Sequence, residues 1–129
     1  MSPGHAATRT TPVRRVLVVD DELLIRWSLC ETLSDHGYAV LEAEDGQGAV
    51  RTLLDATELP DVVLLDFRLP DSTDLNLLER IIRMVPEGRV ILMTAYGTPE
   101  LANEALERGA FKVLHKPFEL QDVTALVAC

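Results

Sequence analysis

The chain has 129 residues, a formal net charge of -9 and 47% hydrophobic residues. This length is typical of one domain with a single core. The acidic balance argues against direct nucleic-acid binding, which needs a basic surface. No apolar run is long enough to span a bilayer, so no membrane contact is expected. Residues 1–13 are polar and lack the apolar segment of a signal peptide, which predicts a flexible N-terminal tail before a domain over residues 14–129.

The cysteine and histidine patterns are against a metal site built from these residues. Cys30 and Cys129 lie far apart and belong to no CxxC pair. This favours reduced thiols in a cytoplasmic protein over a disulfide or a bound metal. His5, His36 and His115 are also widely separated, so a histidine metal site is not expected.

Apolar runs alternate with helical patterns along the whole chain. Asp45, Asp74 and Thr98 are predicted helix caps, and Gly37 and Gly109 follow predicted helix ends. We expect strands at residues 16–19, 38–43, 62–66, 89–93 and 111–114, and helices at residues 22–36, 46–56, 74–84, 98–108 and 119–129.

Strands that alternate with helices predict an α/β protein with a parallel five-stranded sheet between two helical layers. Right-handed crossovers leave few topologies, and we expect the flavodoxin-like (βα)5 order 2-1-3-4-5. The run Val62-Val63-Leu64-Leu65 is fully apolar and ends on Asp66. In open α/β sheets the chemistry lies at the carboxyl ends of the strands. Asp66 is therefore the first candidate for a functional residue.

Four strand ends carry polar residues that converge at one edge of such a sheet. The acids are Asp20, Asp21 and Asp66, with Thr94 and Lys116 beside them. Three adjacent carboxylates repel one another unless a cation intervenes, and Mg²⁺ prefers such oxygen ligands. We expect the ammonium of Lys116 to lack a partner until Mg²⁺ and a phosphoryl group bind. Each residue alone could be a helix cap, but the coincidence of four strand ends favours phosphoryl chemistry with Asp66 as nucleophile.

Four motifs carry a family resemblance from Arg14 to Cys129. In chain order they read VLVVDDE, VVLLDFRLP, ILMTAYGT and VLHKPF. This arrangement resembles the receiver domains of two-component response regulators. The stretches DFRLPD and MTAYG resemble most the receivers of NtrC-type sigma-54-dependent activators.

The resemblance implies a role for each matching residue. It implies a phosphoprotein that takes a phosphoryl group from a histidine kinase and assists its own phosphotransfer and dephosphorylation, without being an enzyme in the ordinary sense. The Lys116–Pro117 bond matches a position that is usually cis. The implied set is Asp66 as phospho-acceptor, Asp21, Asp66 and the Arg68 backbone carbonyl as direct Mg²⁺ ligands, Asp20 as a ligand through water, Thr94 as the phosphoryl-binding hydroxyl and Lys116 as its ion partner.

Two positions depart from the family pattern. Val113 stands where an aromatic residue is usual, which puts the family's ring switch in doubt, and Asp74 replaces a glycine. We expect Tyr96 to perform part of the switch role and the output face to be the fourth helix, fifth strand and fifth helix. Arg68 and Tyr96 flank the predicted pocket; they either gate water or are simply solvated.

The implied partners are a sensor histidine kinase and a downstream output domain, which NtrC-type proteins supply as an ATPase with a DNA-binding domain. Homodimerisation on phosphorylation is a further expectation.

The last predicted helix reaches Cys129 without a cap, so we expect a longer regulator. Trp27 is either a ring packed at the surface or a kinase contact.

Three alternatives stay open. A degenerate receiver would act only as a docking module. A haloacid-dehalogenase-type phosphatase would need an acid where Arg68 stands, and a nucleotide-binding Rossmann domain would need a glycine-rich loop where Asp20-Asp21-Glu22 stands.

Overall fold

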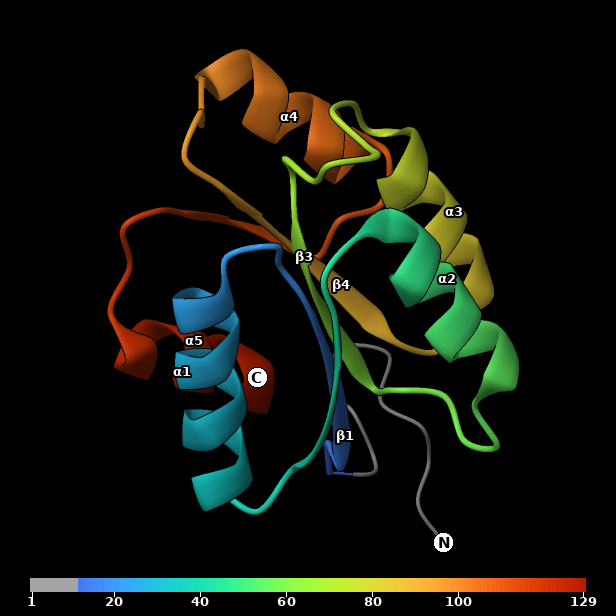
Figure 1. Ribbon diagram of the computed structural model, residues 1–129. Coiled ribbons are helices and arrows are strands. Elements are labelled where there is room, and N and C mark those ends of the chain that lie inside the picture. Colours follow the sequence, from blue (N-terminus) through green and yellow to red (C-terminus); the bar gives the residue numbers. More distant parts are fainter. Residues whose placement is uncertain (1–11) are drawn as a thin grey trace, which may run out of the picture.

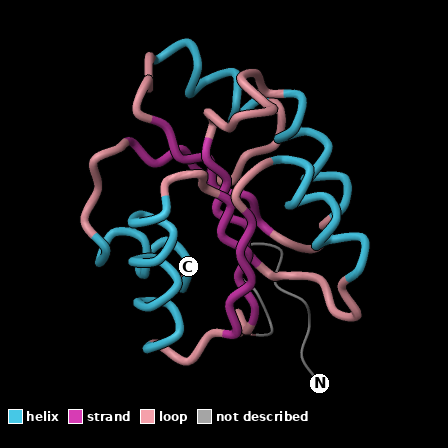
Figure 2. The backbone as a smooth tube through the Cα atoms, in the orientation of Figure 1, coloured by secondary structure: helices cyan, strands magenta, loops and turns pink. Residues whose placement is uncertain are grey.

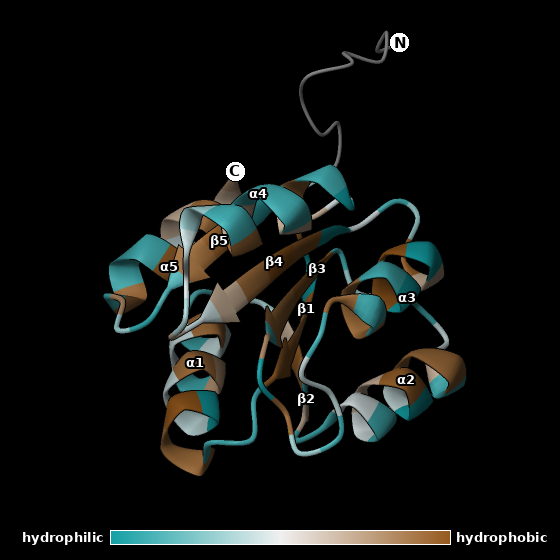
Figure 3. Cartoon of the chain, turned by 90° about the horizontal axis from the view of Figure 1, so that it is seen from above, coloured by the Kyte–Doolittle hydropathy of each residue, from teal (hydrophilic) through white to brown (hydrophobic). Residues whose placement is uncertain are grey.

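A computed structural model describes residues 12–129, so His5 and nearly all of the predicted tail, residues 1–13, lie outside the described residues. Figures 1 and 2 show one sheet between two groups of helices. Its five parallel strands lie in the order β2-β1-β3-β4-β5 (Figure 3). This confirms the predicted fold. The elements are β1 (Arg15–Val19), α1 (Leu23–Asp35), β2 (Ala39–Ala43), α2 (Gly46–Asp55), β3 (Val62–Asp66), α3 (Asn76–Met84), β4 (Arg89–Thr94), α4 (Pro99–Glu107), β5 (Lys112–His115) and α5 (Leu120–Ala128).

The central strands are apolar along their whole length because helices cover both of their faces. Every residue of β3 is buried, while the edge strands β2 and β5 are partly exposed. Helices α1 and α5 cover one face of the sheet, and α2, α3 and α4 cover the other (Figures 1 and 3). The central strands are coloured as hydrophobic in Figure 3, between helices that carry both polar and apolar residues.

Local side chains fix several helix ends as predicted. The carboxylate of Asp45 accepts a hydrogen bond from the Gly48 N–H at 2.7 Å, and the hydroxyl of Thr98 accepts one from the Leu101 N–H at 3.1 Å. Glycines with positive φ follow α1 and α4, at Gly37 (+93°) and Gly109 (+115°) in chain order.

The prediction that Asp74 caps the third helix is wrong in detail. Leu75 occupies the cap position, and α3 begins at Asn76. Asp74 lies one residue further out, and its carboxylate accepts the Asn76 N–H at 2.9 Å. The difference arises because Leu75 turns into the core, where it is 5% exposed.

Of the helices in the described residues, none is long and apolar enough to cross a membrane.

The loop after β3 is anchored on a neighbouring helix. The two carboxylate oxygens of Asp71 accept the backbone N–H groups of Gly46 and Gln47 at 2.8 and 2.9 Å. These N–H groups begin α2, so an anion there is favoured. Both bonds lower the pKa of Asp71, with that to Gly46 the larger cause. The loop is thus held at both ends, by β3 and by α2.

Candidate functional site

Three carboxylates meet at the carboxyl ends of β1 and β3. These strands are parallel neighbours, and Val19 pairs with Leu65, so the residues that follow, Asp20 and Asp66, lie side by side. One carboxylate oxygen from each of Asp20, Asp21 and Asp66 lies within 4.8 Å of the other two. Asp20 is fully buried and Asp66 is 6% exposed, whereas Asp21 is exposed. This donor set fits a hard divalent cation.

Lys116 follows β5 and extends its ammonium into the acidic cluster. Its Nζ atom lies 2.9 Å from Oδ2 of Asp20 and 3.3 Å from Oδ1 of Asp66. Oε1 of Glu22 is also 3.3 Å away. The expectation of an ammonium without a partner is wrong, because three carboxylates contact it. Glu22 was missed as a site residue, although its place directly after the acid pair could have indicated it. The Lys116–Pro117 peptide bond is cis.

The electrostatics of the cluster are those of a site that requires cations. Burial is the main cause that raises the pKa of Asp66, to about 6, and the Asp20 charge adds to it. Lys116 opposes both effects. Burial alone would lower the pKa of Lys116, but its hydrogen bond to Asp20 and the neighbouring charges raise it. At neutral pH the cluster therefore holds a charged lysine among carboxylates that repel one another.

A contact between Arg68 and Tyr96 connects the loop after β3 with the loop after β4. Thr94 ends β4 and is 1% exposed; its hydroxyl oxygen accepts the Tyr96 N–H at 2.9 Å. The guanidinium carbon of Arg68 lies 4.2 Å from the centre of the Tyr96 ring. Arg68 and Tyr96 are therefore in contact with one another, and both are exposed to solvent.

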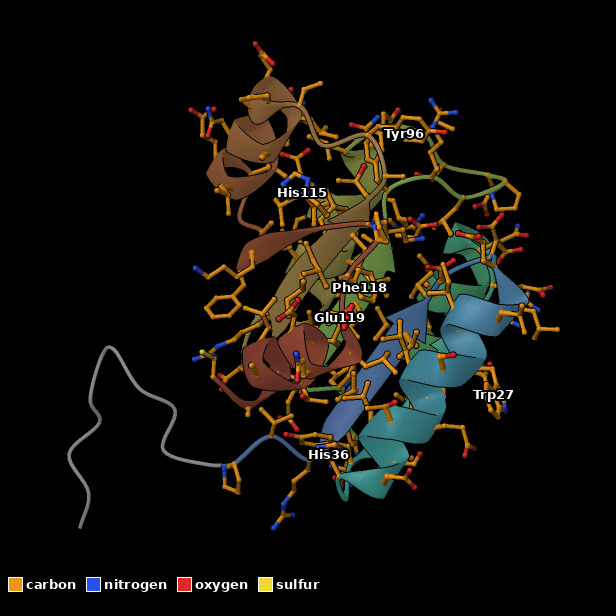
Figure 4. All side chains as sticks on the ribbon, turned by 90° about the vertical axis from the view of Figure 1, so that its left-hand side faces the viewer. Trp27, His36, Tyr96, His115, Phe118 and Glu119 are labelled. Carbon is orange, nitrogen blue, oxygen red and sulfur yellow. The ribbon has the colours of Figure 1, made fainter. Side chains whose placement is uncertain are left out.

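The ring beside the loop after β4 belongs to His115. Val113 is partly buried in the core cluster under α2, α3 and α4. Side chains alternate along a strand, so Val113 and His115 share a face of β5. A Cβ atom on Gly97 would collide with the His115 ring, so this ring lies directly against the loop backbone. Figure 4 shows His115 and Tyr96 at the same end of the molecule.

An apolar surface lies on the first half of α1, close to the acidic cluster. Leu23, Leu24 and Trp27 are 66%, 77% and 60% exposed. Figure 4 shows the Trp27 side chain pointing outward from the helix. This exposure is consistent with both interpretations of Trp27, a ring packed at the surface and a kinase contact.

The described residues include two cysteines, Cys30 and Cys129, and two histidines, His36 and His115. Cys30 and Cys129 are free thiols. Burial, the largest cause, raises the pKa of Cys30 to about 11, which is typical of an unreactive thiol. His36 and His115 lie at opposite ends of the molecule (Figure 4).

Comparison with known proteins identifies the family. The family model described as the response regulator receiver domain matches residues 16–128. The chain is 39% identical over 112 residues to the DNA-binding transcriptional regulator NtrC of Escherichia coli (strain K12), covering 87% of this chain and 24% of that protein. It is 36% identical over 110 residues to sporulation initiation phosphotransferase F of Bacillus subtilis (strain 168), covering 84% of this chain and 86% of that protein.

Solved structures agree with this result. The crystal structure of the CheX-CheY-BeF3-Mg+2 complex from Borrelia burgdorferi matches with a TM-score of 0.81 and 28% identity, covering 88% of this chain and 86% of that chain. The present chain spans about a quarter of the length of the NtrC protein that it matches. From the family model, the relatives and the geometry of the acidic edge, the chain belongs to the receiver domains of two-component response regulators.

Proposed function

We propose that this receiver domain accepts a phosphoryl group on Asp66 from a sensor histidine kinase. Asp21, Asp66 and the Arg68 backbone carbonyl hold Mg²⁺ directly, and Asp20 holds it through water. The observation that carries the proposal is the convergence of three carboxylates within 4.8 Å with a lysine ammonium 3.3 Å from Asp66. The structure from Borrelia burgdorferi, a CheX-CheY-BeF3-Mg+2 complex, supports the same arrangement by likeness.

The transfer requires little from the protein except placement and charge. A carboxylate oxygen of Asp66 forms a bond to phosphorus, while the bond between phosphorus and the histidine nitrogen breaks and its electron pair stays on the ring. Bound Mg²⁺ supplies positive charge to the phosphoryl oxygens. Lys116 holds its ammonium beside the Asp66 oxygen, and the Thr94 hydroxyl donates a hydrogen bond to an oxygen of the transferred group. The domain is an acceptor that assists its own phosphorylation and dephosphorylation.

Phosphorylation by a small donor tests this proposal without a kinase. Wild type, Asp66→Asn and Asp74→Asn are incubated with acetyl phosphate, with Mg²⁺ or with EDTA, and the added mass is located by mass spectrometry. Asp74 is a matched control because it lies in the loop that follows the same strand. We expect modification of wild type and Asp74→Asn in Mg²⁺ only. Comparable modification of Asp66→Asn, or of wild type in EDTA, would refute it.

We propose that the kinase partner binds the first half of α1. Leu23, Leu24 and Trp27 form an exposed apolar surface that follows directly after the acid pair, so a partner bound there can bring its phosphohistidine to Asp66. We expect Trp27→Ala to slow transfer from a purified histidine kinase but not from acetyl phosphate. Leu54→Ala is the control, since Leu54 is 71% exposed on α2. Equal slowing from both donors would place the effect in the site instead.

The output is placed on α4, β5 and α5, and the likeness to NtrC supports a DNA-binding output domain. We further propose that the full-length protein carries an ATPase domain, forms a homodimer on phosphorylation and is located in the cytoplasm. The net charge of -9 argues against nucleic-acid binding by the receiver domain and so supports a DNA contact in that output domain. If wild type takes no phosphoryl group under any condition, a degenerate receiver that serves as a docking module becomes the better description.

A further inference from the structure

Arg26, in the first turn of α1, folds back over the loop that carries the acid pair. Its Nη1 atom donates to the backbone carbonyl oxygen of Asp20 at 2.7 Å, and its Nε atom donates to Oε1 of Glu42 on β2 at 2.8 Å. The arginine side chain is only 12% exposed. We propose that Arg26 is a positioning residue that orients the Asp20–Asp21 peptide for Mg²⁺ binding, an inference that rests on the proposed function.

The position of this arginine is electrostatically unfavourable without its two acceptors. A cation near the beginning of a helix opposes the helix dipole, and a nearly buried guanidinium loses hydration. The planar, forked guanidinium compensates by making two bonds in different directions. One acceptor is a carboxylate on a neighbouring strand. The other is the carbonyl of the first acidic residue, which ties the arginine to the site.

The bond to Arg26 completes the restraint of Asp20. The Asp20 N–H donates to the Ala43 carbonyl at 3.1 Å, and the Asp20 carboxylate accepts the Glu22 N–H at 2.9 Å. The Asp20 carbonyl and the Asp21 N–H belong to one planar peptide unit. A hydrogen bond that fixes this carbonyl therefore also fixes the orientation of the Asp21 N–H group. Since Asp21 is exposed, its backbone is the main restraint on where its carboxylate lies.

Two other roles for Arg26 predict different results. If the guanidinium acted only through its charge, it would repel a divalent ion, and its removal would tighten Mg²⁺ binding. If the arginine only joined α1 to β2, the loss of either partner would lower stability and leave Mg²⁺ affinity unchanged. A positioning role predicts weaker Mg²⁺ binding in a folded protein.

The test measures Mg²⁺ affinity by calorimetry and by amide shifts of the loop in wild type, Arg26→Met and Glu42→Gln. Methionine removes the donors and the charge but keeps most of the apolar stem. We expect about tenfold weaker binding in Arg26→Met, at the lower end for groups that orient metal ligands. Glu42→Gln keeps the bond to the Asp20 carbonyl and should bind Mg²⁺ nearly as wild type. Binding by Arg26→Met that is equal to wild type or tighter would overturn the proposal.

A measurement on wild type covers the case in which Arg26→Met does not fold. A guanidinium that is fixed by two bonds should show a protected Nε–H signal and restricted rotation about its terminal groups in NMR spectra. A rapidly exchanging, freely rotating Arg26 would overturn the proposal without any variant. If wild type neither binds Mg²⁺ nor accepts a phosphoryl group, the proposed function itself is wrong. If wild type does both and Arg26→Met binds Mg²⁺ as tightly as wild type, only the positioning role of Arg26 is wrong.

Discussion

The ammonium of Lys116 and the carboxylate of Asp20 form an ion pair 2.9 Å long, in which the aspartate is completely buried. A buried carboxylate needs a countercharge or hydrogen bonds. Lys116 provides both and also reaches Asp66, 3.3 Å away. The residue that is implied as the ion partner of a phosphoryl group is therefore also part of the structural support for the acidic edge.

Replacing Lys116 should lower stability without preventing folding. In EDTA we expect Lys116→Met to lose about 2–3 kcal/mol of unfolding free energy, because one buried and one nearly buried carboxylate lose their countercharge. Millimolar Mg²⁺ should recover part of this loss by binding the native state. Urea denaturation measures both, with Lys112→Met, at an exposed position of β5, as the control. Equal stability of Lys116→Met and wild type would contradict the structural role, and the variant should also fail to respond to phosphorylation.

Asp66 should make stability depend on pH in the ion-free protein. Its folded pKa, about 6, lies above the ordinary value of 3.8, so between these values the native state binds more protons than the unfolded state. The contribution of Asp66 to native stability then falls as pH rises from 3.8 to about 6 and is constant above. Asn does not titrate, so Asp66→Asn should gain up to about 3 kcal/mol over wild type at pH 7 and little near pH 4. Melts in EDTA across this range would contradict the prediction if the difference did not change with pH.

The contact between Arg68 and Tyr96 should prolong the life of the phosphorylated state. The pair links the two loops beside Asp66, and its loss would admit water to the acyl phosphate. A cation–π contact at an exposed site is worth about 0.5–1 kcal/mol, so Tyr96→Ala should speed phosphate release about two- to fivefold. Tyr96→Phe keeps the ring and should behave as wild type. The measurement is the rate of phosphate release after removal of acetyl phosphate. Identical rates in all three proteins would contradict a role of this contact in excluding water.

His115 should matter more than Tyr96 for the signal that reaches α4. The prediction that Tyr96 acts as the switch stays a prediction, but the residue is 56% exposed and its ring contacts Arg68. The His115 ring lies against Gly97, in the loop that leads into α4. On adding beryllium fluoride and Mg²⁺, we expect His115→Ala to lose much of the α4 amide shift change and His115→Phe to keep it. A full α4 response in His115→Ala, together with its loss in Tyr96→Ala, would restore the original assignment.

The sheet and its acidic edge were predictable because they depend on patterns along the chain. Apolar runs such as residues 62–65 specify buried parallel strands, and such strands place the residues that follow them, Asp20 and Asp66 among them, at a common edge. Cap residues such as Asp45 and Thr98 act on backbone groups only three residues away. Local chemistry was enough in these cases.

The side-chain network around that edge was not predictable in the same way. Arg26 meets the Asp20 carbonyl, and Lys116 meets Glu22 across 94 positions of the chain. These contacts depend on the distance between α1, β2 and the end of β5, which only the packed structure sets. Asp74 failed as a cap for a related reason, since the burial of Leu75 decided where α3 begins.

The fit of the His115 ring against Gly97 also constrains how this sequence can diverge. A side chain at position 97 requires the ring of His115, an exposed residue, to move aside, whereas a smaller residue at position 115 requires no such movement. An evolutionary path that changes both positions is thus easier when position 115 is replaced first. The two sites are therefore expected to be epistatic. Among diverging copies of this chain, side chains at position 97 should be more frequent in lineages that have lost the ring.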